Sequence, residues 1–155
     1  MGKVFLTLEI MMFPGMLHLS IAKALVKDNI DIAAQNGSAT EKGAFTGEVP
    51  MSCLRDYGIK NVLIGHSERR SHYKETDEIC TAKVKLALQE GLRIIFCIGE
   101  SLAERQDGRT TEVLARQLDA IFSHIEEADA WKRLVVAYEP VWAIGTGQVA
   151  ANEQI

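Results

Sequence analysis

The chain has 155 residues, of which 47% are hydrophobic and 25% are charged, and its formal net charge is −4. This composition is typical of one globular domain and excludes a disordered tail. The acidic balance gives no reason to expect nucleic acid or an anionic membrane as a partner. No apolar run reaches the roughly 18 uninterrupted residues that a membrane-spanning helix needs.

The N-terminal segment and the cysteines both indicate a cytoplasmic protein. Residues 1–16 are largely apolar, but Glu9 interrupts the run and no small-residue cleavage site follows it, so we do not expect a secretion signal. The three cysteines, Cys53, Cys80 and Cys97, are odd in number and have no CxxC spacing. They are therefore expected to be reduced core thiols rather than disulfide partners or zinc ligands.

Short apolar runs predict five buried β-strands. The first lies within residues 4–12, and the others begin near Ile30, Val62, Ile94 and Val135. The last four starting points are 32, 32 and 41 residues apart. Runs that are apolar on both faces are typical of parallel strands that are covered on both sides.

Helical patterns fill the gaps between these runs. Apolar residues at helical spacing mark a helix after the first run (Leu17, Ile21, Ala24 and Leu25) and a longer one before the last run (Leu114, Leu118, Ile121 and Ile125). Pro50 suits the first position of another helix, which Gly58 ends. Ser101 and Glu104 have the spacing of a capping box, which would open a further helix.

The helix that follows Thr76 is predicted in more detail. Thr76 can cap it, and Asp77 and Glu78 place negative charge in the first turn, where the helix dipole favours it. Gly91 is expected to end it. The residues expected to face the protein interior are Ile79, Ala82 and Leu86. The residues expected to lie in solvent, on this helix and beside it, are Lys83, Lys85 and Arg93.

The predicted elements alternate as β-α-β-α-β-α-β-α-β, which indicates a repeated right-handed βα unit and a parallel sheet. Two arrangements of the sheet remain possible: a doubly wound open sheet and an arc of a (β/α)8 barrel. A doubly wound sheet usually carries a glycine-rich turn after its first strand, and Phe13-Pro14-Gly15 is a poor match to GxGxxG. The pattern therefore favours the barrel.

His66 and Glu139 each follow a predicted strand directly, so both are expected at the carboxyl rim of the sheet, where ligands bind. Either residue alone would more often have a structural role, and the pair on one rim favours a functional one. A helical turn from Ser67 to Arg70 would hold His66 near the positive end of a helix dipole and keep its ring neutral. A carboxylate beside a neutral imidazole suits proton abstraction next to a carbonyl, with the ring stabilising an enediolate oxygen.

Small residues at 144–147 offer backbone N–H groups that can close over an anion. An ordinary surface turn is the alternative, and the rigid, bulky flank Pro140-Val141-Trp142 argues against it. The remaining histidines lack partners at metal-ligand spacing and are expected on the surface or in helices; they are His18, His72 and His124.

Five blocks resemble the triosephosphate isomerase family: residues 34–36, 43–48, 65–70, 97–100 and 137–147. The resemblance covers nearly the whole chain from about Pro14 onward. It implies an α/β fold, a (β/α)8 TIM barrel of which this chain would hold about strands two to six. Residues 1–155 would then form a single domain that is incomplete at both ends.

The resemblance implies the interconversion of dihydroxyacetone phosphate and glyceraldehyde 3-phosphate through an enediolate, a step of glycolysis and gluconeogenesis that needs no cofactor or metal. It implies that His66 is the electrophile, Glu139 the catalytic base and Gly145 part of a phosphate-gripping lid. Ser67 and Glu68 would support His66, and in the family Glu68 contacts an active-site lysine. Thr46 lies on a loop that inserts into a partner subunit, which implies a homodimer.

The chain also departs from the family pattern. The family lysine belongs to an Asn-x-Lys motif at the end of the first barrel strand, and Lys3 lies too close to Pro14 to be that residue. Two further strands, with backbone groups of the phosphate site, also have no counterpart. We therefore expect weak or no isomerase activity from this chain alone. The alternatives are a catalytically inactive fragment that acts only as a dimerising or structural remnant, and another phosphate-binding barrel with different chemistry.

Overall fold

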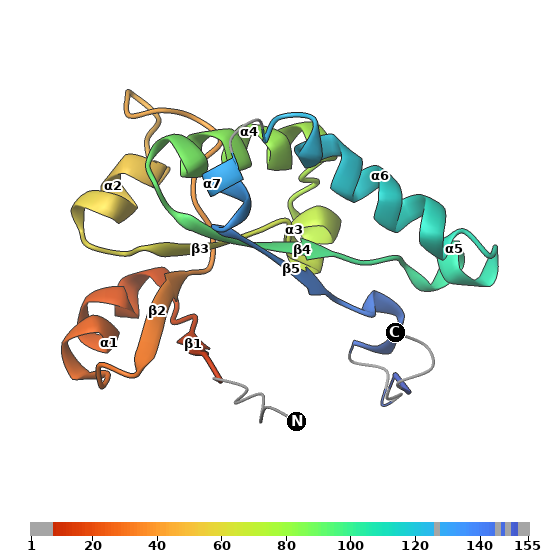
Figure 1. The fold of residues 1–155 in the computed structure, drawn as a ribbon, viewed down its shortest axis with the longest axis horizontal. Coiled ribbons are helices and arrows are strands. Elements are labelled where there is room, and N and C mark those ends of the chain that lie inside the picture. The colour runs from red at the N-terminus through yellow and green to blue at the C-terminus, as the bar shows by residue number, and fades with distance from the viewer. Residues whose placement is uncertain (1–7, 126–127, 145–146, 148–149, 152–155) are drawn as a thin grey trace, which may run out of the picture.

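The computed structural model describes residues 8–125, 128–144, 147, 150 and 151. Five parallel strands form one curled sheet in chain order: β1 (Ile10–Met12), β2 (Ile30–Ala34), β3 (Asn61–Ile64), β4 (Arg93–Ile98) and β5 (Leu134–Tyr138). Because a doubly wound sheet reverses its strand order, the sequential order confirms an arc of a (β/α)8 barrel (Figure 1).

Helices connect the strands and lie outside the curl. They are η1 (Met16–His18), α1 (Leu19–Leu25), α2 (Met51–Asp56), α3 (Ser67–His72), α4 (Asp77–Gln89), α5 (Leu102–Gln106), α6 (Thr110–Phe122), α7 (Ala128–Trp131) and η2 (Val141–Ala143). The expected capping box is present, since Ser101 Oγ accepts from Glu104 N and the Glu104 carboxylate accepts from Ser101 N. In the described part of the chain, no helix has the length and apolar character needed to cross a membrane.

The main core lies between the sheet and the helices. Parallel register places Val62 beside Ile94 and Ile64 beside Phe96, and all four side chains are almost completely buried. They pack against α2, α4 and α6 in one continuous cluster. The apolar runs of the sequence therefore became strands because one face meets this core and the other faces the inside of the curl.

The concave face carries a polar pair that the sequence did not indicate. Arg93 points to this face, and its Nη2 lies 2.6 Å from Glu9 Oε2, across the curl from β4 to the residue before β1. Asn61, on the same face, donates to the Ile32 carbonyl at 3.3 Å. The expectation that Arg93 lies in solvent holds only in part, because strand alternation turns its side chain, which is 31% exposed, toward the inside of the curl.

Helix α4 begins as predicted, but its buried face is different. Thr76 Oγ1 accepts from Ile79 N, which confirms the cap. The fully buried residues are Cys80, Val84 and Ala87, whereas Ile79 is exposed and Ala82 and Leu86 are only partly buried. Lys83, expected in solvent, is buried too. The helix packs against α2 and α6 as well as β3 and β4. Its buried surface is therefore broader than the single row of residues predicted, and it is rotated around the helix axis from that row.

Lys74, between α3 and α4, has a φ of 57°, a left-handed conformation that is strained for residues with a Cβ. Its Nζ donates to the Ser71 carbonyl at 2.6 Å. We expect Lys74→Gly to be more stable than Lys74→Ala by about 1 kcal/mol, because both variants lose the lysine contact and only glycine relieves the strain. Urea unfolding of the two variants measures the difference, and equal stabilities would contradict the explanation.

Candidate active site

His66 and Glu139 meet at the carboxyl rim of the sheet. Glu139 follows β5 directly, and its backbone N–H donates to the Ile98 carbonyl at 2.8 Å, so the end of β4 fixes its position. His66 is the N-cap residue of α3. The Nε2 atom of His66 lies 2.8 Å from Glu139 Oε1. The structure thus brings together, from the ends of β3 and β5, the two residues that the sequence singled out.

The hydrogen bonds around His66 define its tautomer. Its Nδ1 accepts from the backbone N–H of Glu68 at 3.3 Å, so the proton of the neutral ring is assigned to Nε2, which donates to Glu139. The other carboxylate oxygen of Glu139 accepts from Ser67 N at 2.9 Å. The site therefore presents a carboxylate that can take a proton beside an N–H that can donate to an oxygen.

Cys97, in β4, and Gly99, just after β4, shape the surroundings of Glu139. Burial, and then the nearby Glu139 carboxylate, raise the pKa of the Cys97 thiol to about 12, so the thiol adds no charge beside Glu139. A Cβ on Gly99 would lie 2.0 Å from the Glu139 carbonyl oxygen, so only glycine fits there. Gln117 holds Gly99 by accepting from its N–H at 2.9 Å and donating to its carbonyl at 3.2 Å.

A buried carboxylate anchors the end of β5. Glu100 is fully buried and accepts hydrogen bonds from Tyr138 Oη at 3.0 Å, Arg105 Nη1 at 2.9 Å and Thr110 Oγ1 at 3.3 Å. Burial, with the bond to Glu100, raises the pKa of Tyr138. The Arg105 guanidinium also lies 4.3 Å from the centre of the Trp142 ring, in η2. This cluster fixes the backbone on both sides of Glu139.

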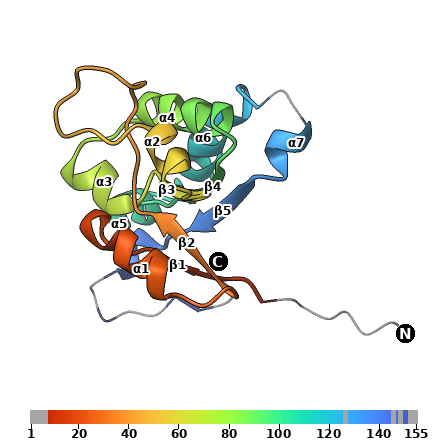
Figure 2. The ribbon, with the colours of Figure 1, turned by 90° about the vertical axis from the view of Figure 1, so that its left-hand side faces the viewer.

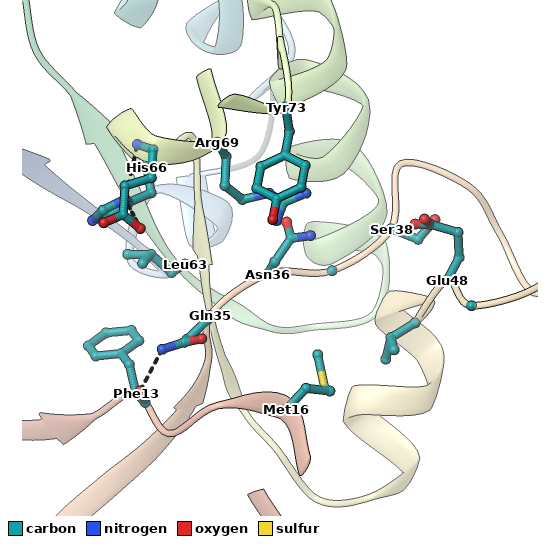
Figure 3. Close-up of a pocket in the computed structure, with 14 residues that line it drawn as sticks. Phe13, Met16, Gln35, Asn36, Ser38, Glu48, Leu63, His66, Arg69 and Tyr73 are labelled. Atoms are coloured by element: carbon teal, nitrogen blue, oxygen red, sulfur yellow. Dashed lines mark hydrogen bonds and ion pairs between the residues drawn. The ribbon is translucent and has the colours of Figure 1, made fainter. Parts of the chain in front are cut away.

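Two hollows adjoin the His66–Glu139 contact. His66 lines one of about 640 Å³, formed by the segments after β1, β2 and β3 (Figure 3). Gln35 crosses its floor and donates to the Phe13 carbonyl at 3.1 Å. Glu139 lines the other, of about 450 Å³. Both volumes fall in the range of small-molecule sites, and the reactive pair lies between them.

A buried ion cluster supports the wall of the larger hollow. Lys83 Nζ donates to Asn36 Oδ1 at 2.8 Å and also pairs with Glu75 Oε1. Arg69 Nε donates to the same Glu75 oxygen at 2.6 Å. Burial lowers the pKa of Lys83, while the Glu75 carboxylate opposes that shift. Sequence reasoning missed this cluster, although it holds Asn36 and Arg69 at the edge of the hollow.

The other expected site residues lie in different places. The Glu68 side chain is exposed, with Oε2 3.7 Å from His66 Nδ1. Thr46 lies in the exposed segment before α2, and its chain neighbours Gly47 and Glu48 line the same hollow as His66. Gly145 is outside the described residues, so its expected place in a lid is not tested. Among the described residues, no group of three or more histidine, cysteine or acidic side chains could hold a metal ion.

Comparison with known proteins agrees with this geometry. The sequence model of triosephosphate isomerase matches residues 3–155. Among curated proteins, the chain is 45% identical over 146 residues to triosephosphate isomerase of Coprinopsis cinerea, covering 94% of this chain and 58% of the relative. It is 45% identical over 153 residues to triosephosphate isomerase of Hahella chejuensis, covering 98% of this chain and 60% of the relative.

A third relative is glycosomal triosephosphate isomerase of Trypanosoma cruzi, 50% identical over 142 residues, covering 91% of this chain and 56% of the relative. The chain thus spans less than two thirds of the length of these relatives. The family model nevertheless matches nearly all of this chain, over a range that spans both rim positions. The chain belongs to the triosephosphate isomerase family.

Proposed function

We propose that His66 and Glu139 form the proton-transfer pair of a triosephosphate isomerase. The observation that carries this proposal is the 2.8 Å contact between His66 Nε2 and Glu139 Oε1, made by a ring whose Nδ1 is an acceptor. Glu139 takes a proton from C1 of dihydroxyacetone phosphate while His66 donates a hydrogen bond to the carbonyl oxygen. The resulting enediolate is reprotonated at C2 while the hydroxyl proton on O1 passes to O2, which gives glyceraldehyde 3-phosphate.

The neutral state of His66 is important to this role. A neutral ring has one N–H, which donates to Glu139 in the structure described here. Substrate must therefore replace Glu139 as the acceptor, which frees the carboxylate to act as a base. Ser67 N–H still holds the second carboxylate oxygen at 2.9 Å, so Glu139 keeps one fixed contact during this exchange. By family resemblance, Gly145 would help to hold the phosphate.

The test is turnover of glyceraldehyde 3-phosphate by the purified chain. We expect weak or no turnover, because the chain spans only 56–60% of the length of these relatives. Any turnover should fall by about 10²–10⁴-fold in Glu139→Gln, which keeps the size of the side chain and removes the base. Substantial turnover that this variant abolishes would contradict the expected weakness. Turnover that survives the change would contradict the assignment of Glu139.

A structural remnant without activity is the second candidate. Two observations favour it: β5 is the last strand of the sheet among the described residues, and its Val135 and Val136 are exposed. A folded chain without detectable turnover would support this candidate.

A homodimer in the cytoplasm completes the proposal. Figure 2 shows the segment between β2 and α2, which includes Thr46, standing out beyond the helices. Its exposed residues could enter the hollow beside His66 of a second copy, as the family resemblance implies. A glycolytic role supports the cytoplasmic location, although one relative is named as glycosomal.

A further inference from the structure

Gln117 is the polar member of the buried row of helix α6. The other members of that row, four residues away on either side, are Val113 and Ile121, which are apolar. Gln117 itself is only 4% exposed. Burying an amide without hydrogen-bond partners costs stability. A glutamine at this position therefore needs a partner for its oxygen and another for its nitrogen.

Both partners belong to one residue, Gly99. The Gln117 side-chain oxygen accepts from the Gly99 N–H at 2.9 Å, and its nitrogen donates to the Gly99 carbonyl at 3.2 Å. The paired register of β4 and β5 ends at Ile98 and Tyr138, so among the described residues no strand bonds to Gly99. Gln117 therefore takes the place of a strand partner and satisfies, from a helix, the two backbone groups of Gly99.

Gly99 contacts the backbone of Glu139. A Cβ on Gly99 would lie 2.0 Å from the Glu139 carbonyl oxygen, so the two backbone segments touch. The N–H of Glu139 donates to the Ile98 carbonyl at 2.8 Å, directly before Gly99 in the chain. The backbone of Glu139 is thus placed by two consecutive residues of one segment, and Gln117 holds the second of them.

Two directional contacts of the Glu139 side chain depend on this placement. Its Oε1 lies 2.8 Å from His66 Nε2, and its Oε2 accepts from Ser67 N at 2.9 Å. Hydrogen bonds weaken steeply as their angles depart from the preferred range. A misplacement of about 1 Å, caused by a change far from the chemistry, can lower a rate by about 10²-fold. The pair is therefore sensitive to whatever holds Gly99.

We infer that Gln117 is a positioning residue for Glu139, which it reaches through Gly99. Its two hydrogen bonds hold the segment after β4 where the Glu139 carboxylate meets both His66 and Ser67. The inference rests on the proposed role of Glu139 as the base. The alternative is a purely structural role in α6. Both hydrogen bonds described for the Gln117 side chain go to Gly99, which favours positioning.

The experiment replaces the amide by apolar groups in Gln117→Met and Gln117→Leu and observes two groups to which Gln117 does not bond. Nitrogen NMR of the purified chain detects the Nε2–H of His66, and hydrogen exchange measures the Ser67 amide, both of which donate to Glu139. We expect loss of the protected Nε2–H signal and at least tenfold faster exchange at Ser67. Circular dichroism shows which variant keeps the fold, and one folded variant suffices.

Ile121→Val is the matched control. It removes a methylene from the same buried row of α6, one turn after Gln117, and leaves both bonds to Gly99 in place. Its unfolding midpoint in urea should fall, because a buried apolar group is lost. The His66 and Ser67 signals should nevertheless match those of the unaltered chain.

Three results would overturn the inference. These are unchanged signals in a folded Gln117 variant, equal changes in Ile121→Val, and unfolding of both Gln117 variants, which would assign the residue to stability alone. The measurements are made without substrate, so none of these results decides whether Glu139 is the base. That assignment fails separately, when turnover survives in Glu139→Gln.

Discussion

Glu75→Leu should destabilise the protein by about 3–5 kcal/mol, because it leaves the buried Lys83 ammonium without a counter-ion. The Lys83 side chain is only 4% exposed, and Asn36 would be its one remaining partner among the contacts described. Arg69 also loses Glu75, but its side chain is 27% exposed and can reach water. Urea unfolding followed by circular dichroism measures the loss. Glu41→Leu, at an exposed glutamate, is the control and should stay within about 0.5 kcal/mol.

The pH dependence identifies Lys83 as the cause. Burial lowers the pKa of Lys83 in the folded state below 10.5, the ordinary value that it keeps in the unfolded chain. At any pH between the folded and the unfolded pKa, the unfolded chain therefore binds more protons than the folded one. The cost of burying charged Lys83 therefore falls, and stability increases, as pH rises toward 10.5. Because Glu75 raises the pKa of Lys83, losing Glu75 lowers the folded pKa further and widens the pH range over which stability increases. The deficit of Glu75→Leu should shrink at high pH, and adding Lys83→Met should recover most of it. A deficit that is constant with pH would contradict this account.

Gly99→Ala should both destabilise the fold and separate Glu139 from His66. The new Cβ would lie 2.0 Å from the Glu139 carbonyl oxygen and 3.0 Å from Val141 Cγ2, so the backbone after β5 must move. Overpacking of this kind costs about 1–3 kcal/mol. Urea unfolding measures the cost, and nitrogen NMR of the His66 ring reports the loss of its bond to Glu139.

Gly15→Ala is the matched control for this change. The nearest atom to its added Cβ is His18 Nδ1 at 3.6 Å, an ordinary contact, so its stability and its His66 spectrum should match those of the unaltered chain. If Gly99→Ala behaves like Gly15→Ala, the close approach of β4 and β5 does not position Glu139.

Much of the fold follows from local sequence. Val62 and Ile94 lie in runs that are apolar on both faces, and such runs become parallel strands because helices cover one side and the curl encloses the other. Thr76 and Ser101 were recognised as helix starts because a cap depends on residues within one turn. The order of the strands then follows from short right-handed connections.

What the sequence did not show depends on contacts between distant elements. Lys83 has the pattern of a surface lysine until α4 packs against α2 and α6, which buries it beside Glu75. Arg93 pairs with a residue 84 positions earlier, and no local pattern predicts that contact. The site shows the same division. His66 and Glu139 are recognisable because each ends a strand, whereas the role of Gly99 appears only when β4 and β5 lie side by side.

The thiol beside the proposed base has a consequence for oxidative chemistry. Peroxides and alkylating agents attack thiolates, and with a pKa of about 12 roughly one Cys97 in a hundred thousand is ionised at neutral pH. A sulfinate at this position would place a permanent negative charge against Glu139. By keeping Cys97 protonated, burial at the end of β4 protects that carboxylate from damage, whereas Cys53, in α2, is partly exposed and more accessible to such reagents.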